Sequence, residues 1–149
     1  NRLILTVFAK DIIFEKDIEE KAKEDDEINL DVSNEVVLIG HICKKPIYRK
    51  TPFGREIADL LLAVNRAYNK SDYIPCIAWG RNARFCENMP VGTELKIIGR
   101  VQSRAYEKKY EDGTVENRVA YEVSIGSLEV AGDGTIENQE EKEENKEAM

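Results

Sequence analysis

Residues suited to binding a polyanion recur along one stretch of the chain, ELKIIGRVQSRAYEKKY at positions 94–110. Successive side chains of a strand point to opposite faces, so a strand here would gather the even-numbered positions on one face. Those positions hold Lys96, Ile98, Arg100, Gln102, Arg104, Tyr106, Lys108 and Tyr110. Cations can follow phosphates and exposed rings can accept unstacked bases, so this face suits a single-stranded nucleic acid. A solvated strand face that carries two tyrosines is the alternative.

The elements that must position this face follow from the same two-residue alternation. It predicts strands over residues 34–45, 56–66, 73–79, 94–110 and 118–130. Residues 81–94 predict one short helix that ends at Pro90 and Gly92, and the sequence EDGT at 111–114 predicts a hairpin turn. One helix between the third and fourth strands and a long hairpin between the fourth and fifth predict an all-β fold, a five-stranded barrel of the OB type.

The third predicted strand, YIPCIAW, carries an aromatic residue at each end of one face, Tyr73 and Trp79. Six residues along a strand separate the two rings by roughly 20 Å, so they do not touch each other. The opposite face of this strand already holds an apolar set, which weakens core packing as the reason for the rings. We therefore expect them to extend the binding surface, with a subunit contact as the alternative.

The net charge of −7 is unusual for a protein that binds a polyanion, but the charges are unevenly distributed. Residues 34–131 hold 15 Lys and Arg against 12 Asp and Glu, whereas the two flanks together hold 7 against 17. The acidic residues therefore lie in the flanks, and the predicted barrel is weakly basic.

Metal-binding and catalytic patterns are not found in the sequence. Cys43, Cys76 and Cys86 form no CxxC pair, and the single histidine, His41, has no cluster of ligands around it. We expect no disulfide framework, no metal, no cofactor and no enzymatic activity. A carboxylate-based nuclease on the same fold is a weaker alternative, because the acidic residues of the predicted barrel are scattered.

The first 17 residues, NRLILTVFAKDIIFEKD, align without a gap to residues 117–133, NRVAYEVSIGSLEVAGD. Both copies change the phase of their apolar residues midway, as a bulge in a long strand would. The match predicts that residues 1–16 are the last strand of a preceding OB domain, which would need an edge to pair with. A chance likeness between two β-rich segments is the alternative.

The remaining flanks are dominated by charge. Residues 17–33 are poor in apolar side chains and predict a linker, and residues 132–149 predict an acidic, disordered tail. This leaves residues 34–131 as the OB-fold domain. No apolar run approaches the roughly 18 residues of a membrane span, so we expect a cytoplasmic protein with no membrane partner.

Several motifs of the predicted barrel occur together in a fixed order. The opening pattern comprises Asn34, Val36, Leu38, Gly40, Pro46, Arg49 and Gly54. The segment YIPCIAWG follows at 73–80, and the triplet Gly99, Arg100 and Val101 lies in the fourth strand. With these motifs, residues 34–130 resemble the bacterial single-stranded DNA-binding protein family, OB-fold proteins that coat unwound DNA. The preceding strand suggests a tandem-OB member.

The resemblance implies site residues. The aromatic stacking positions of the family fall on Tyr68, Tyr73, Trp79 and Tyr106. Phosphates would be held by Arg49, Arg66, Lys96, Arg100, Arg104 and Lys108. Three of the four rings are tyrosine where the family often has tryptophan, which weakens stacking. Ile74 stands where many members carry a histidine near their subunit contact.

We therefore expect this chain to bind single-stranded DNA with little sequence preference and to protect unwound DNA in replication, recombination or repair. The resemblance implies a homo-oligomer, dimer or tetramer, and replication proteins as possible partners. A rival hypothesis is a degenerate OB module that serves oligomerisation or partner docking in a replication or primosome-like assembly, with its rings buried in interfaces.

Overall fold

The computed structural model describes residues 4–14 and 33–131. The second range holds six strands, one α-helix and one 3₁₀ turn. The elements in order are β1 (Val36–Ile42), β2 (Ile47–Lys50), β3 (Glu56–Arg66), the 3₁₀ turn η1 (Ala67–Asn69), β4 (Lys70–Trp79), α2 (Arg81–Cys86), β5 (Glu94–Lys109) and β6 (Val115–Val130).

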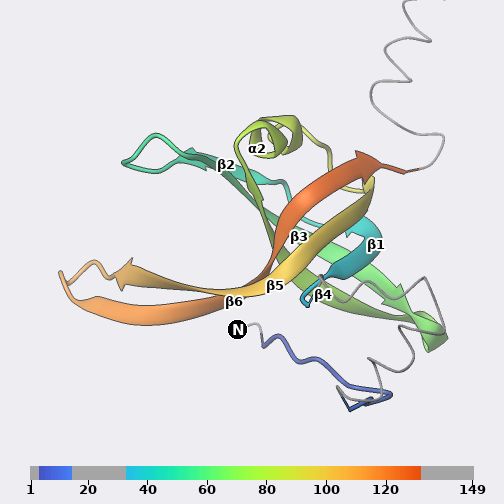
Figure 1. Ribbon diagram of the computed structural model, residues 1–149. Helices are drawn as coiled ribbons and strands as arrows, with labels where there is room; N and C mark the ends of the chain where they lie inside the picture. The colour runs from blue at the N-terminus through green and yellow to red at the C-terminus, as the bar shows by residue number, and fades with distance from the viewer. Residues whose placement is uncertain (1–3, 15–32, 132–149) are drawn as a thin grey trace, which may run out of the picture.

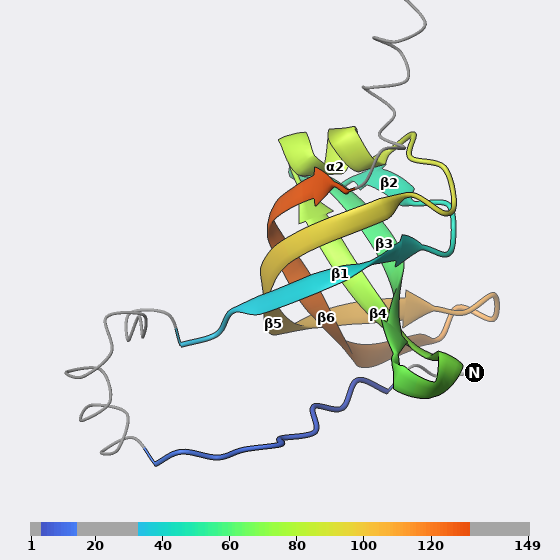
Figure 2. The ribbon, with the colours of Figure 1, turned by 90° about the vertical axis from the view of Figure 1, so that its right-hand side faces the viewer.

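Five of these strands close into a barrel. The hydrogen-bonded order runs β1, β5, β6, β4, β3, and β1 also pairs with β3 through His41 with Ala63 and Ile42 with Leu62. Gly40 lies where β1 passes from β5 to β3, and a Cβ there would lie only 2.5 Å from the backbone oxygen of Ala63. Figure 2 shows β1 crossing the front of the barrel. The prediction of a five-stranded OB barrel with one helix between its third and fourth strands is confirmed.

The core lies inside the barrel, and its inward residues lie at alternate positions of the strands, although Ile57 and Ile77 on the opposite faces of β3 and β4 are also buried. The largest buried side chains of the barrel include Ile42, Leu60, Leu62, Cys76, Leu95, Ile97, Val123 and Ile125. The helix α2 covers one end of the barrel (Figure 1) and adds Ala83 and Cys86 to this core. Burial of these apolar surfaces is the main force that closes the barrel.

The strands β5 and β6 form one hairpin that pairs from Leu95 out to Lys109. The outer half of this hairpin projects beyond the barrel, on the same side as the turn between β2 and β3 (Figure 1). A register shift between Ile98 and Gly99 confirms the predicted phase change in the last strand. The predicted turn is also confirmed, because the Thr114 N–H donates to Asp112 Oδ1 at 2.9 Å.

Three details differ from the sequence-based expectations. Residues 47–50 form a sixth strand, β2, which pairs with β3 outside the barrel closure. The helix ends at Cys86 because tighter turns follow, with the Met89 N–H donating to the Cys86 carbonyl as Met89 enters the core. Residues 67–69 form a 3₁₀ turn, and the strand expected over residues 73–79 begins at Lys70 because the ladder with β3 extends to the Arg66–Lys70 pair.

Residues 4–14 form an extended segment that carries no assigned strand and lies outside the barrel (Figure 2). Its apolar side chains are exposed, including Phe8 and Phe14. The assignment of residues 1–16 to a preceding OB domain stays a prediction. The proposed linker, apart from Ser33, and the proposed acidic tail fall outside the described residues. Within the described ranges, no helix is both long and apolar enough to cross a membrane.

Candidate nucleic-acid interface

Trp79 occupies the end of β4, at the point where β4 meets β6. The two strands run parallel there, with Ile77 opposite Ser124, and the Trp79 indole N–H donates to the Ser124 hydroxyl at 3.1 Å. This bond fixes one edge of the ring, while the side chain stays partly exposed. Ser124 is in turn the cross-strand partner of Arg100 on β5. The tertiary fold therefore brings Trp79 next to the basic stretch, although 45 residues separate it from Ser124.

The even-numbered residues of β5 share one face with their partners on β6, because side chains directly opposite each other in an antiparallel ladder lie on the same side. The pairs along this face are Arg100 with Ser124, Gln102 with Glu122, Arg104 with Ala120, Tyr106 with Arg118, and Lys108 with Glu116. We call this set, together with Trp79, the hairpin face. Along β5 this face carries three cations, an amide and one ring, in the order Arg100, Gln102, Arg104, Tyr106 and Lys108.

One carboxylate of the hairpin face is buried. Glu122 is only 4% exposed and accepts hydrogen bonds from Arg104 Nε at 2.8 Å and from Gln102 Nε2 at 3.0 Å. The hydrogen bond to Glu122 raises the pKa of the Arg104 guanidinium, which burial opposes in part, and the nearby charge of Asp59 also raises it. The same guanidinium lies 6.0 Å from the centre of the Tyr106 ring. Arg104 is therefore held in place by Glu122, beside a ring that is 38% exposed.

Most of the predicted phosphate-binding cations carry a carboxylate partner in the free protein. The pairs are Arg49 with Asp59 at 3.3 Å, Arg66 with Asp72 at 3.1 Å, Lys96 with Glu129 at 3.8 Å and Arg104 with Glu122 at 2.8 Å. Arg100 makes only a long hydrogen bond to Gln102, at 3.5 Å. Lys108 lies 5.3 Å from the centre of the Tyr110 ring. Within the described part of the chain, Arg100 and Lys108 are thus the two predicted cations without an ion pair.

The predicted rings Tyr68 and Tyr73 lie toward the opposite end of β4 from Trp79. Tyr68 is 94% exposed in the turn η1, with a φ of +65°. A left-handed backbone costs a residue with a side chain roughly 1–2 kcal/mol, so this ring is held outward at an energetic cost. Tyr73 is 55% exposed, and Arg66 with its partner Asp72 lies nearby on the β3–β4 ladder.

The two remaining predicted cations, Arg49 and Lys96, lie on different strands, and Arg49 is in register with Trp79 through Ile57 of β3. The Arg49 side chain donates a hydrogen bond to Asp59 on the outer side of β3, and the charge of Asp59 also raises the pKa of Arg104. Arg49 therefore borders the hairpin face. Lys96 instead lies between Ile39 of β1 and Glu129 of β6, on the part of β5 before the register shift. The structure thus gathers the predicted residues into the hairpin face and the β3–β4 tip and leaves Lys96 near β1.

The outer end of the hairpin holds a further cluster that the sequence pattern only partly indicated. The Tyr110 hydroxyl donates to Glu116, and Arg118 donates both to that hydroxyl, at 2.9 Å, and to Glu116, at 3.0 Å. The hydrogen bond to Glu116 raises the pKa of Tyr110, and the hydrogen bond from Tyr110 lowers the pKa of Glu116. Arg118 was not among the predicted residues, because its place opposite Tyr106 depends on the hairpin register.

The turn between β2 and β3 supplies two more candidates that the sequence reasoning missed. Phe53 is 96% exposed at this turn, and Arg55 is exposed beside Trp79. Nothing in the sequence TPFGR indicates proximity to a residue 24 positions further on. Among the residues that the structure describes, no group of three or more His, Cys, Asp or Glu is arranged to hold a metal ion.

Comparison with known proteins identifies the family of this chain. The model of the single-strand binding protein family matches residues 33–131, which is more than half of the chain. The chain belongs to this family. A single-stranded DNA-binding protein of Clostridium tetani is 41% identical over 88 residues, a match that covers 54% of this chain and 59% of the relative. Single-stranded DNA-binding protein 3 of Clostridium acetobutylicum is 39% identical over 102 residues, covering 62% and 69%.

The fold of this single-strand binding family member is also similar to a solved structure. The wild-type single-stranded DNA binding protein from Thermus aquaticus superposes with a TM-score of 0.55 at 25% identity, covering 72% of this chain and 45% of that one. The likeness confirms the OB-type barrel. The names of these relatives describe binding, in agreement with the expectation that the chain is not an enzyme.

Proposed function

We propose that this chain binds single-stranded DNA with little sequence preference and protects it while it is unwound. In this proposal bases stack on Tyr68, Tyr73, Trp79 and Tyr106, and phosphates bind to Arg49, Arg66, Lys96, Arg100, Arg104 and Lys108. Each base stacked on an aromatic side chain contributes roughly 1–3 kcal/mol, and every base offers a flat face, so stacking does not select a sequence.

The observation that carries the proposal is the position of Trp79. Its N–H is anchored on Ser124, next to Arg100, and the hairpin face continues from there to Tyr106. Because the Trp79 indole is held at its N–H edge, a face of the ring is available to stack on a base. Arg100 beside it can bind the adjoining phosphate. Membership of the single-strand binding protein family supports the same conclusion.

The ion pairs of the free protein affect how binding should respond to salt. A phosphate that binds Arg49 or Arg66 must compete with Asp59 or Asp72, so these two cations add less affinity than an unpaired one. Arg100 and Lys108 form no ion pair among the described residues, although Glu116 lies opposite Lys108 on the hairpin. Because phosphate contacts release counterions from DNA, affinity should fall as the salt concentration rises. The slope of log affinity against log salt is set by the number of cations that contact a phosphate.

The test uses the fluorescence of Trp79, which is the only tryptophan of the chain. Titration with oligo(dT) at low salt should quench this fluorescence, and the affinity should fall steadily as salt is added. Oligonucleotides of other sequence should bind within a few-fold. A titration without any change at low salt, with the fold intact by circular dichroism, would favour the rival module that docks partners.

The exposed edge of β1 supports the expected homo-oligomer. Val37 and Ile39 on the outer face of β1 are each 54% exposed, and residues 36–40 of β1 pair only with β5. An open strand edge beside exposed apolar side chains is suited to pairing with a second copy. The proposed homo-oligomer, dimer or tetramer, therefore uses β1. Sedimentation of a Val37→Glu/Ile39→Glu variant should give monomers, and an unchanged oligomer would reject this surface.

The cellular setting of this activity belongs to the same proposal. Binding without sequence preference suits protection of single strands in the cytoplasm during replication, recombination or repair. Replication proteins are the corresponding partners. A pull-down with the full chain on single-stranded and double-stranded DNA beads tests whether such partners depend on the single strand.

A further inference from the structure

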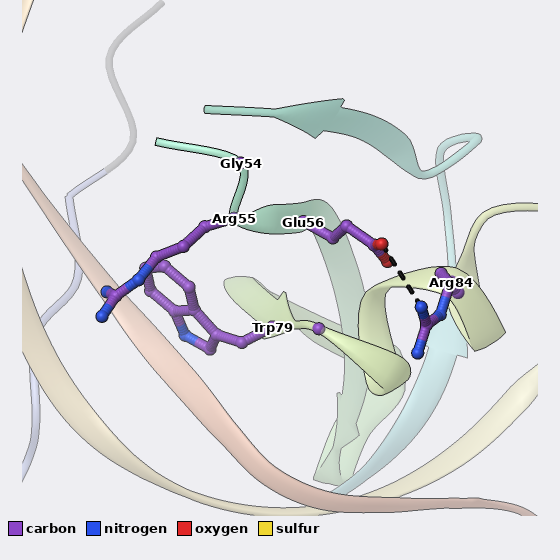
Figure 3. Close-up of a pocket in the computed structure, with 6 residues that line it drawn as sticks. Gly54, Arg55, Glu56, Trp79 and Arg84 are labelled. Carbon is purple, nitrogen blue, oxygen red and sulfur yellow. Dashed lines mark hydrogen bonds and ion pairs between the residues drawn. The ribbon is translucent and has the colours of Figure 1, made fainter. Parts of the chain in front are cut away.

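A cavity of about 430 Å³ lies beside Trp79, where the β2–β3 turn approaches the end of β4 and the beginning of α2 (Figure 3). Its lining consists of Gly54, Arg55, Glu56, Trp79, Gly80 and Arg84. This volume lies within the range of small-ligand sites, about 300–1,000 Å³. The predicted binding residues include only one member of this lining, Trp79.

Backbone hydrogen bonds hold the walls of the cavity in place. Gly54 and Gly80 have φ angles of +80° and +56°, and no atom lies within 4 Å of the place where a Cβ would stand on either one. The Gly80 N–H donates to the Glu56 carbonyl at 2.9 Å, which ties the end of β4 to the beginning of β3. Two further bonds between Thr51 and Arg55 hold the turn. The walls are therefore fixed before a ligand arrives.

The two ends of the cavity differ in what their side chains are bonded to. Arg84 donates to Glu56 at 3.3 Å, so these two charges neutralise each other. Arg55 and Trp79 project toward the other side, where the Arg55 side chain lies beside the indole ring (Figure 3). In the part of the chain described, Arg55 makes no ion pair. A cation and the face of a ring are thus both available at one end.

We propose that Arg55 and Trp79 form a nucleotide subsite, in which the base stacks on the indole and the Arg55 guanidinium binds the phosphate attached to that nucleotide. The inference rests on the proposed function and deepens it, because it extends the path of the strand from the hairpin face to the β2–β3 turn. A guanidinium is suited to this role, since its planar fork of donors matches two phosphate oxygens. The contact involves no base edge, so it adds affinity without sequence preference.

The subsite is tested with Arg55→Ala and a matched control, Lys109→Ala. Lys109 is exposed and follows Lys108, so its side chain lies on the opposite side of the hairpin from the hairpin face. Anisotropy of labelled oligo(dT) is measured over a series of salt concentrations for the wild type and both variants. Arg55→Ala should lower the slope of log affinity against log salt by about one, as expected for one lost phosphate contact, and Lys109→Ala should leave the slope unchanged.

The outcomes separate this inference from the function on which it rests. If the wild type quenches and binds but Arg55→Ala has the wild-type slope, the subsite is rejected while the proposed function stands. If the wild type does not bind at all, the proposed function itself fails. A loss confined to one oligonucleotide sequence would reject the phosphate contact in favour of a base contact. Arg55→Gln, which keeps the polar length of the side chain, should lose the same slope as Arg55→Ala.

Discussion

Replacing Arg104 by alanine should destabilise the protein far more than replacing Arg100, although both belong to the hairpin face. Glu122 is 4% exposed, and Arg104→Ala removes its only cationic partner in the described chain. Removing one member of a buried ion pair costs about 3–5 kcal/mol, because the remaining charge is left uncompensated. Gln102 still donates to Glu122 at 3.0 Å, so we expect the lower end of this range, about 3 kcal/mol.

Arg100→Ala serves as the control for the loss of stability expected from Arg104→Ala. Arg100 is exposed and has only a 3.5 Å hydrogen bond to Gln102. Arg100→Ala should therefore change stability by less than about 0.5 kcal/mol, as is usual at the surface. It should instead lower the salt dependence of DNA binding by about one unit of slope.

Urea unfolding at pH 7, followed by circular dichroism, provides the assay. With m-values of about 1–3 kcal/mol/M for small domains, a loss of about 3 kcal/mol lowers the urea midpoint by about 1–3 M. Adding Glu122→Gln to Arg104→Ala should restore part of the loss, since the buried charge is then gone. A loss below about 1 kcal/mol for Arg104→Ala, or an equal loss for Arg100→Ala, would refute the assignment of Arg104 to a buried ion pair.

Three further outcomes are expected. Gly99→Ala should destabilise the barrel by about 1–3 kcal/mol in urea unfolding, as overpacking does, because its Cβ would lie 2.2 Å from the Ser124 carbonyl oxygen; a change within experimental error would contradict this contact. Burial raises the pKa of the Cys76 thiol to about 12 and that of Cys86 to about 11, so neither should react with iodoacetamide at pH 8 until the protein unfolds, as read by mass spectrometry. Hydrogen bonds from Thr114 lower the pKa of Asp112 in the folded protein. The ionised Asp112 therefore stabilises the fold above the unfolded pKa of about 3.9, and this stabilisation is lost as the pH falls through the lower pKa of the folded state. The melting temperatures of the wild type and Asp112→Asn should therefore differ at pH 7 and converge toward pH 2; a constant difference would reject this cause.

The pattern along single strands was enough to predict much of the barrel. Alternation along residues 94–101 separates the even-numbered face from Leu95 and Ile97, which point the other way, and both of these side chains are fully buried. Burial of one face imposes a period of two on a strand, so the sequence of a strand reveals its inner face. The β5–β6 turn was predictable for a local reason as well, since an Asp-Gly pair favours a tight hairpin.

The organisation of the site was less predictable. The even-numbered positions of β5 indicated a basic face, but four of the six predicted cations are paired with carboxylates. Arg104 and Glu122 are 18 residues apart, and their contact depends on the hairpin register, which no single strand encodes. The sequence indicated which side chains face outward, and not which of them neutralise one another.

The sequence by itself therefore determined the class of fold, the inner faces of the strands and the kinds of groups offered to a ligand, because these properties depend on neighbours within a few residues. The tertiary structure alone decided where those groups meet. The parallel contact of β4 with β6 joins Trp79 to Ser124 and so to Arg100, and the turn before β3 brings Arg55 to the same ring. Such encounters arise from barrel closure, which pairs segments that are distant along the chain.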